Sequence, residues 1–265
     1  MNANAPLVFI TGASSGIGQA LAVRFHRAGY RLALVARRVA EVEAWAQSQG
    51  FAASTWAVYQ ADVRDTAAIT GAGRACIAAQ GLPDVVIAAA GFSVGMDTAV
   101  YEDLEVMRAL YETNNLGMTA TFQPFVSPMV ARRSGTFVGI ASVSGIRGLP
   151  GHGGYCSSKA AAISYCESLR VELRSSGVKV VTISPGYVDT PLSRGNPYSM
   201  PFLMQADDFA NQAFETIERG TSYRVIPWQM ALVAKLMRVL PNALFDRLAS
   251  GRGRKPRAPH HSSQQ

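Results

Sequence analysis

The first thirty residues combine an apolar run, a glycine-rich turn and a helical pattern, which restricts the fold more than any other part of the chain. Residues 7–11 (LVFIT) are apolar and partly β-branched, which indicates a buried strand. Glycines 12, 16 and 18 follow, and a helical pattern continues to Ala28. Such a turn lets the backbone approach a phosphate, and the next helix offers free N–H groups to it. The spacing GxxxGxG is not the commoner GxGxxG, so a plain strand-to-helix turn is an alternative.

Strand and helix patterns alternate along the rest of the chain. Further strands are expected at residues 31–36, 55–60, 84–90, 137–142, 178–184 and 223–226. After Asp84, the run over 84–90 (DVVIAAA) is entirely apolar, as in a parallel strand covered on both faces. A long helical pattern over 101–131 contains Asn114, a poor helix former, near its middle. The alternation predicts a single α/β domain of the Rossmann type, a doubly wound parallel sheet with helices on both faces.

The positive charge of the chain is concentrated at its C-terminal end. The net charge is +7, but residues 1–220 contain 17 basic and 17 acidic side chains and are neutral. A nucleic-acid-binding protein is expected to carry its basic surface on the folded body. Nucleic acid is therefore not an expected partner.

Cysteine and histidine show no arrangement typical of a metal site or a disulfide framework. The three cysteines, Cys76, Cys156 and Cys166, are sparse, and the four histidines do not cluster. We expect reduced core cysteines and no metal. The N-terminal residues lack the basic segment of a signal peptide, so we expect a cytoplasmic protein.

The end of the strand over 31–36 bears on the choice of a dinucleotide. An acidic residue there would bind the adenine ribose 2′-hydroxyl and select NAD, whereas this chain has Arg37 and Arg38. Two guanidinium groups suit a 2′-phosphate, which favours NADP. The alternative is that both arginines begin a solvated helix.

Asp62 and Val63 follow the strand over 55–60. The Asp62 carboxylate is in a position to accept a hydrogen bond from an adenine amino group. It is equally suited to mark the start of the next helix.

Tyr155 and Lys159 stand four residues apart in a helical pattern, so their side chains share one face. An ammonium beside a phenol lowers the phenol pKa from about 10 toward the range of a general acid/base. Ser142, at the end of an apolar run, is placed to hydrogen-bond a substrate oxygen. A surface Tyr–Lys pair on an amphipathic helix is the alternative.

Asn114 and the loop over 192–204 can each be interpreted in two ways, one functional and one structural. Asn114 either bends or solvates its helix, or opens a water path toward Lys159. The apolar, turn-rich loop over 192–204 either covers a substrate pocket at the carboxyl end of the sheet or packs on the body.

Several motifs, in this order and spacing, resemble those of the short-chain dehydrogenase/reductase family over about residues 6–226. They are TGASSGIG (11–18), Asn114, Ser142, YCSSK (155–159) and SPGYVDT (184–190). The resemblance implies an NAD(P)-dependent oxidoreductase with a sheet of about seven parallel strands. It also implies a homodimer or homotetramer formed through the helices of Asn114 and Tyr155.

The resemblance assigns roles to individual residues. Tyr155 would be the catalytic acid/base, Ser142 would bind the substrate oxygen, and Lys159 would hold the nicotinamide ribose and lower the tyrosine pKa. Asn114 would relay protons through water. With Tyr155, Lys159, Arg37, Arg38, Asp62 and Val63, the expected cofactor-binding residues are Gly12, Ser14, Ser15, Gly16, Ile17, Gly18, Ala90, Gly91, Pro185, Gly186, Val188 and Thr190. Ala89 departs from the Asn-Ala-Gly usual in the family, which bears on local rigidity more than on chemistry.

These features predict NADPH-dependent reduction of a ketone or aldehyde, expected to be lipophilic, with Tyr155 as proton donor. Two alternatives are an NAD-dependent alcohol dehydrogenase and a non-enzymatic nucleotide-binding scaffold. Family likeness does not identify the substrate.

Beyond residues 1–226, the sequence predicts an amphipathic helical extension (227–250) and a disordered basic tail (251–265). In the extension, Met230, Val233 and Met237 recur at helical spacing until Pro241 interrupts the pattern. The favoured interpretation is a helix over the substrate pocket or against a partner subunit. The alternative is a helix on an anionic membrane surface, bound through residues 228–257.

Overall fold

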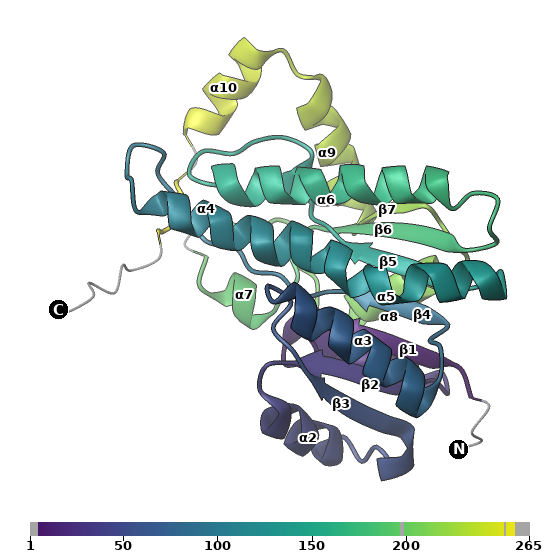
Figure 1. Ribbon diagram of the computed structural model, residues 1–265. Helices are drawn as coiled ribbons and strands as arrows, with labels where there is room; N and C mark the ends of the chain where they lie inside the picture. Colours follow the sequence, from purple (N-terminus) through teal and green to yellow (C-terminus); the bar gives the residue numbers. More distant parts are fainter. Residues whose placement is uncertain (1–4, 197–198, 252, 258–265) are drawn as a thin grey trace.

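The computed structural model describes residues 5–196, 199–251 and 253–257, and its centre is one parallel sheet (Figure 1). Seven strands form the sheet in the order β3-β2-β1-β4-β5-β6-β7. Their bounds are β1 Leu7–Thr11, β2 Arg31–Ala36, β3 Trp56–Gln60, β4 Val85–Ala88, β5 Thr136–Ile140, β6 Lys179–Pro185 and β7 Tyr223–Ile226. The predicted doubly wound, Rossmann-type parallel sheet is thereby confirmed.

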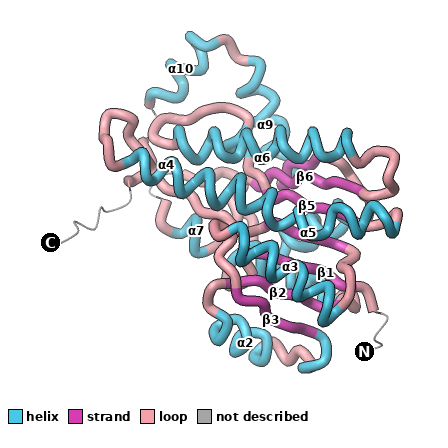
Figure 2. The backbone as a smooth tube through the Cα atoms, viewed as in Figure 1, coloured by secondary structure: helices cyan, strands magenta, loops and turns pink. Residues whose placement is uncertain are grey.

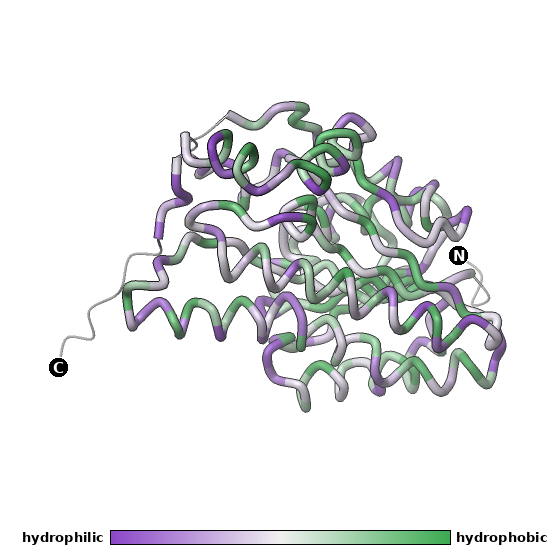
Figure 3. Tube along the Cα trace, turned by 90° about the horizontal axis from the view of Figure 1, so that it is seen from above, coloured by the Kyte–Doolittle hydropathy of each residue, from purple (hydrophilic) through white to green (hydrophobic). Residues whose placement is uncertain are grey.

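Helices cover both faces of the sheet, as Figure 2 shows in cyan around the magenta strands. One face is covered by α3 (Thr66–Gln80), α5 (Gly117–Arg132) and α6 (Gly153–Glu172), and the other by α1 (Gly16–Arg27), α2 (Val39–Ser48) and α8 (Ala206–Glu218). Side chains alternate between the faces: Leu7 and Phe9 join the first core, whereas Val8 and Ile10 join the second. The strands at the centre of Figure 3 are accordingly the most continuously hydrophobic part of the chain.

The long helical pattern over 101–131 is interrupted at Asn114. Helix α4 (Asp103–Tyr111) passes through a π-helical turn, Glu112–Leu116, into α5. Such turns widen a helix by one residue and often occur at functional sites. The helix is therefore irregular at Asn114, which lies within the π-helical turn.

The carboxyl ends of the central strands meet at one edge of the sheet. Thr11 pairs with Ala88 of β4, and Ala88 in turn pairs with Gly139 of β5. Strand β1 lies between β2 and β4, so successive connections leave it in opposite directions. Open α/β sheets bind their ligands at such a switch point.

Three short helical segments lie outside these layers. They are two 3-10 turns, Ala53–Thr55 and Val143–Gly145, and α7 (Pro191–Arg194). The second 3-10 turn and α7 follow β5 and β6, and both therefore lie at the carboxyl edge of the sheet.

The C-terminal extension forms two helices, α9 (Trp228–Val239) and α10 (Asn242–Ser250), separated at Pro241. Arg147, in the loop after β5, holds the junction. Its guanidinium donates to the carbonyl oxygens of Met237 and Leu240 and lies 3.9 Å from the Phe245 ring centre. The extension is therefore fixed to the carboxyl edge of the sheet.

The prediction that residues 251–265 are disordered is wrong for residues 253–257, which pack on the body of the protein. Arg257 donates to both carboxylate oxygens of Asp103 (2.7 and 3.1 Å), and Asp103 is 1% exposed. The basic segment is thus held by an ion pair with Asp103, the first residue of α4. Residues 252 and 258–265 lie outside the described residues.

Candidate active site

The glycine turn before α1 packs tightly against the neighbouring backbone and leaves the start of α1 without a side-chain cap. Gly12 has φ +72°, and a Cβ there would lie 2.8 Å from the Ala90 Cα. A Cβ on Gly18 would lie 2.2 Å from the Gly12 carbonyl oxygen. The Ser15 side chain makes no capping hydrogen bond, and the first turn of α1 contains no acidic residue. The turn therefore fits a dinucleotide pyrophosphate at a helix N-terminus.

The loop after β6 meets this turn. Gly16 has φ +55°, and a Cβ there would lie 3.1 Å from the Thr190 side chain. The predicted residues that line the main cavity are Ile17, Gly91, Ser142, Tyr155, Lys159, Pro185, Gly186, Val188 and Thr190. Gly12, Ser14, Ser15, Gly16 and Gly18 belong to the turn itself. Ala90 lies against Gly12, and its N–H donates to the Thr11 hydroxyl (3.4 Å).

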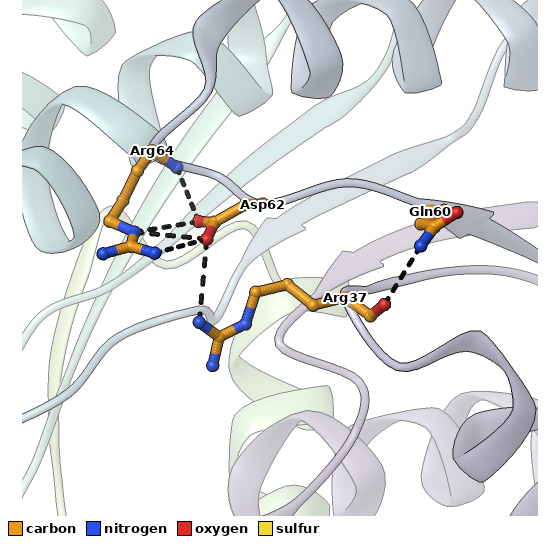
Figure 4. Close-up of polar contacts among 4 residues, drawn as sticks. All are labelled: Arg37, Gln60, Asp62 and Arg64. Carbon is orange, nitrogen blue, oxygen red and sulfur yellow. Dashed lines mark hydrogen bonds and ion pairs between the residues drawn. The ribbon is translucent and has the colours of Figure 1, made fainter.

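Arg37 lies at the carboxyl end of β2, at the site predicted for a 2′-phosphate (Figure 4). Its guanidinium is 67% exposed and stands 3.6 Å from the Asp62 carboxylate. Arg64 holds that carboxylate more closely, at 2.7 Å. The Arg37 guanidinium is thus left able to turn toward an anion. Arg38 instead pairs with Glu41 (2.8 Å) at the exposed start of α2, as expected of a solvated helix start.

Asp62 does not cap the next helix, so that interpretation was wrong. The residue that caps α3 is Asp65, whose side chain accepts a hydrogen bond from Ala68 N–H. Asp62 binds Arg64 through both carboxylate oxygens, and this hydrogen bonding lowers the pKa of Asp62. The sequence analysis did not single out Arg64. Val63 is buried against Gly117 at the start of α5.

Ser142, Tyr155 and Lys159 converge on one cavity. Ser142 lies two residues beyond β5 and its hydroxyl accepts a hydrogen bond from Ser144 N–H (3.1 Å). Tyr155 and Lys159 stand one turn apart on α6, and Lys159, 5% exposed, donates to the Ile140 carbonyl oxygen (2.8 Å). The predicted common face of the Tyr–Lys pair is therefore present.

The pKa values correct one expectation. Burial raises the pKa of Tyr155, although its hydrogen bond with Ser142 acts in the opposite direction. Burial also lowers the pKa of Lys159 to about 8. The expected lowering of the Tyr155 pKa by Lys159 is thus wrong for the protein chain alone, because loss of hydration outweighs the other contributions.

The Asn114 side chain ties two parts of the site together. Its oxygen accepts from Phe92 N–H, and its amide donates to the Phe92 carbonyl oxygen and the Ser158 hydroxyl, all at 3.1 Å. These bonds hold the loop after β4, where Ala89 replaces the usual asparagine, against α6. Because these three hydrogen bonds occupy the Asn114 side chain, a proton relay at this residue would have to use its backbone carbonyl oxygen. The relay stays a prediction.

The cavity has a volume of about 400 Å³. Met230, Val233 and Met237 of α9 line it, which agrees with the favoured interpretation of the extension as a helix over the substrate pocket. Its lining also includes Ser93, Leu149, His152 and Lys255, which the sequence analysis did not place there. His152 precedes Tyr155 by three residues, so helical spacing was a usable signal. The sequence contains no local signal for Ser93 or Lys255.

The loop over 192–204 lies at the same cavity. Leu192, Ser193, Asn196, Ser199 and Pro201 line it, which agrees with the predicted substrate-covering loop. Its end is fixed by a bridge between Val188 and Met204. The predicted loop residues Pro197 and Tyr198 lie outside the described residues.

Comparison with known proteins determines the family. The short chain dehydrogenase family model matches residues 6–198. An uncharacterized oxidoreductase of Myxococcus xanthus is 38% identical, over 91% of this chain and 94% of its own length. The chain belongs to the short-chain dehydrogenase family. This dehydrogenase is therefore an NAD(P)-dependent oxidoreductase, as predicted.

A further relative supports the family, and two solved structures share the fold. The dehydrogenase/reductase SDR family member 7B of Bos taurus is 33% identical to the present dehydrogenase, over 97% of this chain and 84% of its own length. A crystal structure of a short-chain dehydrogenase from Streptomyces avermitilis shares the fold, with a TM-score of 0.77 at 21% identity over 93% of this chain and 98% of that one. The structure described as ElxO with NADP bound gives a TM-score of 0.75 at 22% identity over 84% of this chain and 97% of that one.

Within the described part of the dehydrogenase, no group of three or more His, Cys, Asp and Glu side chains is placed to hold a metal ion. No described helix is long and apolar enough to cross a membrane.

Proposed function

We propose that the enzyme reduces a ketone or aldehyde to an alcohol with NADPH, and that Tyr155 donates the proton. The observation that carries this proposal is the convergence of Ser142, Tyr155 and Lys159 on one cavity beside the glycine turn. The cavity wall contributed by Met230, Val233 and Met237 is apolar, which supports a lipophilic substrate.

The mechanism follows from the positions of the side chains. The Ser142 hydroxyl binds the carbonyl oxygen, and the Tyr155 phenol donates a proton to the same oxygen as negative charge develops. When bound, the reduced nicotinamide supplies a hydride to the carbonyl carbon. Lys159 holds the ribose hydroxyls and orients Tyr155 across one helical turn. The Tyr155 phenol is protonated at neutral pH, as a proton donor has to be, because burial raises its pKa further above its ordinary value.

NADP is preferred over NAD in this proposal because Arg37 and Arg64 surround a single carboxylate, Asp62, at the adenosine end. The NADP named in the description of ElxO is consistent with this choice. An NAD-dependent alcohol dehydrogenase is the second candidate, and it requires the opposite direction and cofactor. Membership of an oxidoreductase family and the intact Ser142, Tyr155 and Lys159 favour an enzyme over a nucleotide-binding scaffold.

A carbonyl panel tests this proposal. The purified enzyme is mixed with NADPH or NADH and a series of ketones and aldehydes, and the loss of nicotinamide absorbance is followed. We expect turnover with NADPH, faster for carbonyls with apolar substituents. Oxidation of alcohols with NAD, without any reduction by NADPH, would support the second candidate instead.

The proposed role of Lys159 predicts a pH dependence of cofactor binding. With a pKa of about 8, the Lys159 amine loses its charge as the pH rises through 8. Its hydrogen bonds to ribose hydroxyls then weaken. NADPH affinity, measured by fluorescence, is expected to fall above pH 8 in the wild type and to lack this step in Lys159→Met. A flat wild-type profile, or the same step in the variant, contradicts the role.

Homo-oligomer formation through α4, α5 and α6 also remains a proposal. Exposed apolar side chains on α4, on α6 and on the π-helical turn before α5 support it, namely Leu104, Val171 and Leu116. Light scattering of the purified enzyme checks it, since a monomeric mass would contradict it.

Membrane association is a proposal for the outer face of α9 and α10. Apolar side chains exposed on this face are Trp228, Leu232, Leu236, Val239, Leu244 and Leu248. Lys235, Arg238 and Arg247 lie on the same two helices. The tail is expected to contribute less positive charge to membrane binding than the sequence predicts, because Arg254 pairs with Asp97 and Arg257 pairs with Asp103. The proposal therefore narrows from residues 228–257 to 228–250.

Vesicle co-sedimentation tests the membrane proposal. If α9 and α10 lie on a membrane, the enzyme is expected to sediment with anionic vesicles at low salt, and Leu232→Gln with Leu236→Gln to abolish sedimentation. Leu203→Gln, a change of an exposed leucine outside both proposed faces, serves as control. If the wild type does not sediment with vesicles, and the double variant differs from it only in oligomeric mass, the exposed face of α9 and α10 binds a partner subunit instead of a membrane.

A further inference from the structure

The last described residues run beside the cavity between two loops, and Gly253 and Lys255 line it. The Gly95 N–H, in the loop after β4, donates to the Pro256 carbonyl oxygen (3.0 Å). A Cβ on Gly95 would lie 2.1 Å from the Lys255 carbonyl oxygen, and one on Gly151 would lie 3.0 Å from the Arg254 Cβ. The tail thus fits between the loop after β4 and the loop before α6, beside the start of α4 (Figure 1).

Two arginines anchor this segment. Arg254 pairs with Asp97 at 3.2 Å, and Arg257 pairs with the buried Asp103 at 2.7 Å. These pairs flank Lys255 in the sequence and fix its backbone on both sides. The position of the Lys255 side chain is therefore set by the fold.

Lys255 differs from these arginines in its partner. Its amine donates to the hydroxyl of Ser93 (2.8 Å), which is neutral, and both residues line the cavity. Among the described residues, no carboxylate lies within ion-pair distance of Lys255, and the described lining of the cavity contains no Asp or Glu. An ammonium group has three donors, so further hydrogen bonds are open to a ligand.

The lysine lies close to the reacting groups. The His152 ring centre is 6.4 Å from that of Tyr155. The pKa of His152 is lowered to about 4, chiefly by burial and in addition by the positive charge of Lys255. Burial lowers the pKa of Lys255 as well, because the charged amine loses hydration in the cavity. A bound anion would offset that loss by its attraction to the charged amine. Lys255, His152 and Tyr155 thus line the same cavity, with His152 within interaction range of both other residues.

We propose that Lys255 binds an anionic group of the substrate, a carboxylate or a phosphate, while the carbonyl lies at Tyr155 and Ser142. The apolar wall of Met230, Val233 and Met237 takes the remaining part of the molecule. The substrate class is therefore an amphiphilic oxo acid or oxo phosphate. This inference rests on the proposed carbonyl reduction and adds the feature that selects among carbonyl compounds.

Matched pairs of compounds test the inference. Acetoacetate and levulinate are compared with their methyl esters, and dihydroxyacetone phosphate with dihydroxyacetone, in the enzyme with NADPH. The measured quantity is the ratio of kcat/KM for the charged over the neutral member. Calorimetric binding of the same six compounds gives a second ratio that does not require turnover.

In the wild type we expect the charged member to be favoured in the carboxylate pairs, the phosphate pair, or both, and the preferred pairs identify the anion. In Lys255→Met this ratio is expected to fall about ten- to hundredfold, as for loss of a charge-assisted hydrogen bond. Lys255→Arg should retain most of it. Lys179→Met, a matched change at the opposite end of β6, should leave it unaltered.

The outcomes separate the two proposals. Turnover without preference for the charged members, or a preference that Lys255→Met retains, overturns the role of Lys255 and leaves carbonyl reduction standing. Absence of turnover with every compound counts against carbonyl reduction. The binding ratio then still decides the role of Lys255, because equal binding of charged and neutral members overturns it.

Discussion

Tyr155→Phe is expected to lower kcat for carbonyl reduction by at least about a hundredfold, because general acid catalysis contributes about 10²–10⁴-fold. The change removes only the phenol oxygen. The ring therefore keeps its place beside His152, and the Lys159–Ile140 hydrogen bond is retained. The affinity for NADPH should be nearly unaltered. Steady-state kinetics and a fluorescence titration measure the two quantities.

Thermal unfolding is the control for this variant, since a folded protein is needed to interpret a lost rate. Ser142→Ala should also lower kcat, because its hydroxyl binds the substrate oxygen. A Tyr155→Phe enzyme with near wild-type kcat would show that the proton comes from another group.

Arg37→Ala is expected to weaken NADPH binding by about tenfold and to leave NADH binding nearly unaltered. A charge-assisted hydrogen bond to phosphate contributes roughly ten- to hundredfold in affinity. The Arg37 guanidinium is 67% exposed, so solvent screening favours the lower end. Dissociation constants of both nucleotides, measured side by side, give the comparison.

Arg38→Ala is the matched control, because Arg38 already pairs with Glu41 on the exposed start of α2. It should have the smaller effect, and the double variant tests whether the two arginines share the role. Equal losses for NADPH and NADH in Arg37→Ala would mean that the phosphate is not recognised there.

Much of this protein was predictable from its sequence because the signals were local. The strand, glycine turn and helix over residues 7–28 predicted the first βα unit, and the four-residue spacing of Tyr155 and Lys159 predicted their shared face. Apolar runs gave the strands to within a few residues, since a parallel strand buried on both faces has no polar side. The doubly wound parallel sheet followed from the same alternation, whereas the strand order did not.

The remaining features depend on contacts between distant parts of the chain. A basic, proline-containing tail indicates disorder when considered alone, but Asp103 lies 154 positions earlier and binds Arg257. Lys255 reaches the cavity only because Gly95 and Gly151 admit the tail. The raised pKa of Tyr155 likewise depends on burial, which spacing in the sequence does not report.

Transfer of deuterium tests the central claim most directly. NADPH that carries deuterium at its transferable nicotinamide position is incubated with the enzyme and a carbonyl compound that the panel identifies, and the alcohol is analysed by mass spectrometry. Carbonyl reduction in the cavity of Ser142, Tyr155 and Lys159 predicts one deuterium on the carbinol carbon, formed by the wild type and lost with turnover in Tyr155→Phe. An alcohol without deuterium, or equal labelling by both proteins at equal rates, would contradict it.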